Sequence, residues 1–194
     1  MIMRNRMDKF FLIGIPNCGK STLGRRAADI LRLSFFDTDV MACEKLGTRN
    51  VLDQIRASMN GSMEAAQQKA IGELVALDSA AIIATGAEIA LMRRCAVLLR
   101  KAGTVIHVLR EPEIILADMK NTGGSKWIMQ EKDSGEEIVM RERAVELYAK
   151  DISQYNALAD VMLENNGSED AGVEKLIALI RERHSLSGQC WNIM

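Results

Sequence analysis

Short, continuously apolar stretches alternate along this chain with longer stretches in which apolar residues recur every three or four positions. A short apolar run that ends at a turn residue predicts a buried strand, and the three-to-four spacing predicts an amphipathic helix. We therefore expect strands at residues 9–15, 34–36, 80–84, 104–109 and 159–163. We expect helices at residues 21–33, 40–77 with interruptions, 88–101 and 168–184.

Strands that alternate with helices predict an α/β fold, with a five-stranded parallel sheet between two layers of helices. Parallel connections are right-handed crossovers, so the carboxyl ends of the strands meet at one edge, where ligands bind. The polar, glycine-containing segment 120–137 is typical either of a surface loop or of an active-site lid. We expect one domain over residues 1–184, followed by a tail at 185–194.

The composition excludes several classes of protein. Among 194 residues, 25 Lys and Arg against 26 Asp and Glu give a net charge of -1, which argues against a general nucleic-acid binder. The apolar run at 10–15 is too short for a signal peptide or a membrane span. The four cysteines are far apart and form no zinc motif. We expect a reduced, cytoplasmic protein with no membrane partner.

The residues after the first strand match the phosphate-binding pattern GxxxxGK[ST], and they lie between a strand and an amphipathic helix, as the motif requires. Gly14 and Gly19 allow the backbone to curl so that N–H groups surround a phosphate, which the positive end of the helix also attracts. Lys20 can reach the β- and γ-phosphates of ATP, and the Ser21 hydroxyl can bind Mg²⁺. We expect nucleotide contacts from Gly14, Pro16, Asn17, Cys18, Gly19, Lys20, Ser21 and Thr22.

Two carboxylates close the second strand, in the sequence Asp37-Thr38-Asp39. The topology places this segment beside the phosphate loop, where one acid can hold Mg²⁺ and the other can take a proton from an attacking hydroxyl. The segment is equally typical of a helix N-cap, a role that Thr38 or Asp39 can fill too. These residues alone leave both interpretations open.

Further motifs follow in a recognisable order. They are FLIG at 11–14, GKST at 19–22, FDTD at 36–39, Gly47, ATG at 84–86, and Tyr155 with LADV at 158–161. In order and spacing they resemble the shikimate kinases, over residues 8–184. The resemblance implies a nucleoside-monophosphate-kinase-like fold with a lid, and phosphorylation of an alcohol with ATP and Mg²⁺. The expected partners are ATP and a small-molecule acceptor, and the expected state is a monomer or a weak homodimer.

The resemblance also implies roles for individual residues. Asp37 lies near Mg²⁺ together with Ser21, while Asp39 binds the acceptor hydroxyl and acts as the base. Gly86 contacts the acceptor. The segment 120–137 becomes the lid, and it includes Lys126 as a nucleotide-binding residue.

The acceptor side departs from the family pattern. Where the family has an Arg that holds the substrate carboxylate, residues 63–67 read MEAAQ, and the triple-glycine loop reads Gly86-Ala87-Glu88. A second substrate Arg is replaced in the region 149–151, where Lys150 is the nearest cation. Lysine does not reproduce the bidentate fit of arginine to a carboxylate.

Three hypotheses follow from these departures. The first is a kinase that phosphorylates another small alcohol, and the second is a nucleotide-binding regulatory domain with a degraded acceptor site. A nucleotide or nucleoside kinase that shares the phosphate loop is the third.

Overall fold

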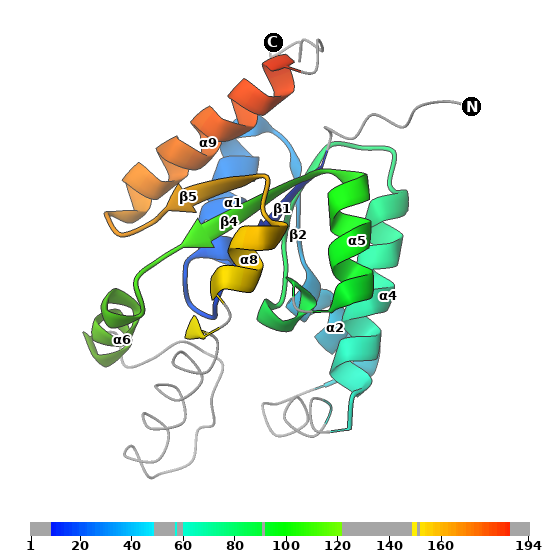
Figure 1. Cartoon of the computed structure of the whole chain (residues 1–194). Helices are drawn as coiled ribbons and strands as arrows, with labels where there is room; N and C mark the ends of the chain where they lie inside the picture. The colour runs from blue at the N-terminus through cyan, green and yellow to red at the C-terminus, as the bar shows by residue number, and fades with distance from the viewer. Residues whose placement is uncertain are drawn as a thin grey trace.

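A five-stranded parallel sheet forms the centre of the structure (Figure 1). The computed structural model describes residues 9–48, 57, 60–90, 92–121, 149–150 and 152–186. Its strands are β1 (Lys9–Ile13), β2 (Ser34–Asp37), β3 (Ala81–Ala84), β4 (Thr104–Leu109) and β5 (Val161–Glu164). They lie in the order β2-β3-β1-β4-β5, each parallel to its neighbours. The predicted α/β fold with a five-stranded parallel sheet is therefore confirmed.

Helices cover both faces of this sheet (Figure 1). On one face, α1 (Lys20–Leu31) packs against α9 (Glu169–Leu186), and α5 (Arg93–Ala102) lies on the other face. The remaining helices are α2 (Thr38–Leu46), α4 (Ser62–Ala76), the 3-10 helix η1 (Ala87–Ala90), α6 (Pro112–Asn121) and α8 (Ile152–Leu158). Within the described ranges, no helix is both long enough and apolar enough to cross a bilayer.

Some boundaries differ from those expected. The helix predicted at 88–101 is divided into η1 and α5. The last strand begins at Val161 instead of 159. Just before it, the side chain of Asp160 accepts a hydrogen bond from Val105 N at 2.9 Å, in place of a backbone carbonyl of a regular strand pair. Residues 122–148 and 187–194 lie outside the described residues, and they include most of the expected lid and tail.

The centre of the sheet is buried on both faces. In β1 the apolar residues Phe10, Phe11, Leu12 and Ile13 have no exposed surface, and β3 and most of β4 are equally buried between the helix layers. The edge strands β2 and β5 are only partly covered. Continuous apolar runs therefore mark the central strands, as expected for a parallel sheet that helices cover on both sides.

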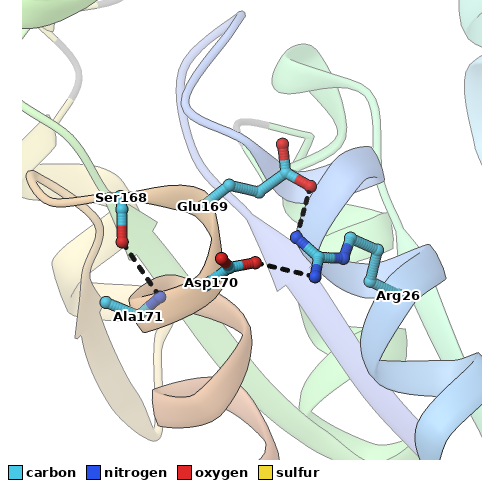
Figure 2. Close-up of polar contacts among 5 residues, drawn as sticks. All are labelled: Arg26, Ser168, Glu169, Asp170 and Ala171. Atoms are coloured by element: carbon cyan, nitrogen blue, oxygen red, sulfur yellow. Dashed lines mark hydrogen bonds and ion pairs between the residues drawn. The ribbon is translucent and has the colours of Figure 1, made fainter.

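An ion-pair cluster links the two helices on one face of the sheet (Figure 2). Arg26 of α1 donates to Glu169 at 2.7 Å and to Asp170 at 2.8 Å, in the first turn of α9. Ser168 Oγ accepts from Ala171 N at 3.3 Å and so caps the same turn. Because these charged groups are exposed, the cluster contributes little free energy. Its effect is to orient the start of α9, which follows directly on the β5–α9 loop.

Gly24 sets how closely α1 approaches the sheet, because a Cβ at this position would lie 2.7 Å from the Phe35 ring and 2.9 Å from Leu12 Cδ1. We expect Gly24→Ala to lower the free energy of unfolding by about 1–3 kcal/mol through overpacking. Gly72→Ala is the matched control, because Gly72 lies in α4 with no atom within 4 Å of its Cβ position. This second change should stabilise the protein by about 0.5–1 kcal/mol through helix propensity. Urea unfolding of both variants measures the difference, and equal effects of the two changes would contradict it.

Candidate functional site

The phosphate-binding motif forms a tight loop between β1 and α1. Three of its residues have positive φ angles: Gly14 (143°), Asn17 (60°) and Gly19 (102°). A Cβ at Gly14 would lie 2.6 Å from Val108 O, so the loop passes too close to β4 for any side chain there. Successive residues with such angles turn backbone N–H groups inward and form an anion-binding concavity.

Lys20 is the first residue of α1, and its side chain lies over this loop. Its Nζ donates to the carbonyl oxygens of Gly14 and Ile15, both at 2.9 Å, and lies 3.7 Å from Cys18 Sγ. An ammonium group has three hydrogens, so one remains for a phosphate oxygen beyond the two carbonyl bonds. The geometry places the lysine charge where the motif predicts it.

Asn165 fixes the loop from the opposite end of the chain. Its Nδ2 donates to Cys18 O at 2.8 Å, its backbone N donates to Leu109 O at 2.8 Å, and the residue is only 4% exposed. A Cβ at Gly19 would lie 2.6 Å from the same Nδ2. The sequence analysis did not identify Asn165, although a polar residue two positions after the last predicted strand was a usable signal.

Ser21 and Asp37 form the next part of the site. Ser21 lies on α1, which follows β1, and Asp37 is the last residue of β2. Ser21 Oγ donates to Asp37 Oδ2 at 2.6 Å, although β3 lies between β1 and β2 in the sheet. The other oxygen of Asp37 accepts from the backbone N of Asp39 at 3.0 Å and of Val40 at 3.4 Å. Asp37 is thus the N-cap of α2, which is the role that the sequence left open for this segment.

This pair of oxygens fits a magnesium ion. Hydroxyl and carboxylate oxygens are the ligands that Mg²⁺ prefers, and the ion is usually held by one or two protein groups together with substrate phosphates. The described residues contain no group of three or more His, Cys, Asp or Glu side chains that would form an all-protein metal site. Ser21 and Asp37 therefore fit the phosphate-dependent kind of site.

Asp39 is a partly buried carboxylate next to this pair. Its Oδ1 accepts a hydrogen bond of 2.5 Å from Gln67 Nε2 of α4. Burial raises the pKa of Asp39 to about 6, and the negative charges of Asp37 and Glu88 add to this effect. The positive charge of Lys20 and the hydrogen bond from Gln67 act in the opposite direction. A carboxylate with this pKa is ionised at neutral pH and is more basic than an exposed aspartate.

The end of β3 closes the site next to Asp39. Gly86 N donates to Thr38 Oγ1 at 2.9 Å, and Thr85 N donates to Leu12 O at 3.0 Å. A Cβ at Gly86 would overlap Asp39 Oδ1 and Gln67 Nε2. Only glycine fits here, and the structure brings Gly86 and Asp39 together as the sequence predicts.

Other predicted residues are less central. Thr22 is exposed on α1, and Pro16 and Cys18 complete the loop. Lys126 lies outside the described residues, and Lys150 is exposed. Gln67 and Glu88 were named in the sequence analysis only as departures from a pattern. The signal for Gln67 is a polar residue on the buried side of an amphipathic helix.

Known proteins share this sequence and fold. A model of the shikimate kinase family matches residues 16–181. A shikimate kinase of Clostridium botulinum (strain Alaska E43 / Type E3) is 27% identical over 173 residues, which cover 89% of this chain and 97% of the relative. The structure of shikimate kinase from Acinetobacter baumannii in complex with shikimate has a TM-score of 0.71 at 20% identity and covers 92% of this chain and 96% of that chain.

The fold is also similar to that of a kinase outside the shikimate kinases. A gluconokinase structure from Sinorhizobium meliloti 1021 has a TM-score of 0.63 at 15% identity and covers 97% of this chain and 99% of that chain. The fold alone therefore does not identify the acceptor.

We expect Asp39→Asn to stabilise the protein above pH 7, because the native structure holds this carboxyl at a raised pKa. The stability that the carboxyl contributes is present below about pH 4 and is lost as the pH rises through about 6. The neutral amide avoids that loss, which is of the order of 1–3 kcal/mol. Thermal unfolding at pH 8 and pH 4 measures the gain, which should shrink at the lower pH.

Asp29→Asn is the control for this measurement, because Asp29 is an exposed carboxylate on α1. Its effect should be small at both values of pH. A loss of stability in Asp39→Asn at pH 8 would show that Asp39 is not a desolvated charge.

Proposed function

Because this chain belongs to the shikimate kinase family of ATP-dependent small-molecule kinases, we propose that it transfers the γ-phosphoryl group of ATP to a hydroxyl group, with Asp39 as the base. The observation that supports this role is that the phosphate loop and the Asp39 carboxylate lie next to each other at the same edge of the sheet. The loop carries its lysine, and the pKa of the partly buried carboxylate is about 6. A domain that only bound nucleotide would have no use for such a carboxylate.

The reaction is an in-line displacement at the γ-phosphorus. The acceptor O–H bond breaks, and its proton goes to the Asp39 carboxylate. The acceptor oxygen forms a bond to the γ-phosphorus, while the bond between that phosphorus and the bridging oxygen breaks and ADP leaves. Burial makes Asp39 a stronger base than a solvated aspartate, and its hydrogen bond to Gln67 holds the carboxylate in place.

Charge stabilisation comes from the phosphate loop. With ATP bound in the phosphate loop, Lys20 and the N-terminus of α1 would stabilise the negative charge that develops on the transferred group and on the leaving phosphate. Ser21 and Asp37 would hold Mg²⁺, which neutralises phosphate charge in such reactions. The proposed nucleotide contacts are the loop residues named above.

We expect Asp39→Asn to lower kcat by about 10²–10⁴-fold, which is the usual contribution of a general base. The affinity for ADP should be nearly unchanged, because the phosphate loop does not depend on this carboxylate. Coupled ADP release measures transfer with shikimate and with a panel of small alcohols, and calorimetry measures ADP binding.

Each outcome of this experiment separates two hypotheses. Equal loss of transfer and binding in a folded variant would contradict the role of Asp39. Nucleotide binding by the wild-type protein without transfer to any acceptor would favour a regulatory domain. Lys20→Ala provides the complementary variant, and it should weaken both binding and transfer.

We expect kcat/KM to fall about tenfold per pH unit below pH 6, because protonation removes the base. The phosphate groups of ATP also titrate near pH 6, so a variant must separate the two effects. Gln67→Leu removes a hydrogen bond that lowers the pKa of Asp39, and the midpoint should therefore move to higher pH. An identical midpoint in both proteins would assign the profile to the nucleotide instead.

A further inference from the structure

The side-chain amide of Gln67 has a nitrogen that already donates to Asp39 and an oxygen that has no hydrogen-bond partner among the described residues. Its Nε2 donates to Asp39 Oδ1 at 2.5 Å, and an ionised carboxylate can only accept, so the orientation of the amide is fixed. The residue is 2% exposed, and its Oε1 is buried without a hydrogen-bond partner among the described residues. The site therefore contains a fixed, unsatisfied hydrogen-bond acceptor beside the base.

Such an atom is costly unless something binds it. A buried polar atom without a partner costs about 1–3 kcal/mol, and these atoms are rare in native proteins. The position of Gln67 explains the exception, because Asp39 and Gly86 place its amide at the carboxyl edge of the sheet, where ligands bind. A donor group on a ligand at this edge would satisfy Oε1.

The charges around the base argue against an anionic ligand. Asp37 and Glu88 both act on Asp39 as negative neighbours, and Lys20 is the cation that opposes them. Two bonds to loop carbonyls hold that cation at the phosphate side. A carboxylate on the acceptor would add a further negative charge next to these groups, and like charges repel strongly in a buried site.

Beside Gln67, α2 and α4 pack against each other through apolar side chains. Met63 lies one helical turn before Gln67, on the same side of α4. It packs with Ala42 and Ala66 in a small buried cluster separate from the main core. Among the described residues, this cluster contains no charged group.

From these observations we infer that the acceptor is a neutral polyol that binds with one hydroxyl at Asp39 and donates a second hydroxyl to Gln67 Oε1. The inference rests on the proposed kinase function and specifies the class of its substrate. A hydroxyl fits both positions, since it donates to an oxygen and can lose its proton to the base.

Matched acceptors test this inference directly. Coupled ADP release is measured with shikimate against methyl shikimate, and with gluconate against sorbitol, so that each pair contrasts a carboxylate with a neutral molecule of similar shape. We expect the neutral member of at least one pair to have a kcat/KM about tenfold higher, because it avoids the repulsion between a carboxylate and the acids around Asp39. Equal or better use of the carboxylated members would overturn the inference and leave the kinase function standing.

A pair of variants tests the role of Gln67 itself. Gln67→Lys keeps a donor for Asp39 but lacks the oxygen, so the ratio of kcat/KM between sorbitol and a monohydric alcohol, both of them neutral, should fall about tenfold. This ratio cancels any effect on the base, because both acceptors use it. Gln68→Lys is the control, since it adds the same charge at the next, exposed position of α4 and should leave the ratio unchanged.

The remaining outcomes are also decisive. An unchanged ratio in Gln67→Lys, or an equal change in both variants, would overturn the assignment of Oε1. If no acceptor of either kind supports ADP release while ADP still binds, the proposed kinase function fails and the inference fails with it.

Discussion

The position of β3 between β1 and β2 is the constraint on which the site depends. This order places Gly86 between the phosphate loop and the segment that carries Asp37 and Asp39. Because the three strands are parallel, all three chain segments leave the sheet at the same edge. The helix α1 then reaches across the end of β3, so that Ser21 contacts Asp37. A different strand order would separate Lys20 from Asp39.

Burial gives this site its chemistry and also its cost. Sheltering Asp39 from water destabilises its charged form, and the fold compensates only in part, through Gln67 and the charge of Lys20. The surrounding acids increase the cost further. A site of this kind retains a reactive carboxylate at the expense of stability, which is a common feature of catalytic centres.

The sequence predicted the fold and the phosphate side more completely than the acceptor side. Apolar runs and a full motif are local signals, so the strands, the loop at 14–21 and the carboxyl-end acids follow from short segments. Asn165 and Gln67 act across about 147 and 28 residues of chain, and no local pattern marks such contacts. The sequence left open whether Asp37 binds Mg²⁺ or caps α2, and in the structure one oxygen of Asp37 caps the helix while the other faces Ser21. A propensity rule assigns one role to each side chain, whereas this carboxylate uses its two oxygens for different purposes.

The contact between Asn165 and the phosphate loop has a consequence for how the protein is made. The ribosome synthesises β1 and the loop first, but both strands that flank β1 and the asparagine that holds Cys18 O emerge later. During translation the motif therefore exists for most of the time as an unsupported segment. The nascent chain acquires a shaped nucleotide pocket only when β5 and the start of α9 have left the exit tunnel. Nucleotide binding would therefore stabilise a chain in which Asn165 is in place in preference to shorter fragments.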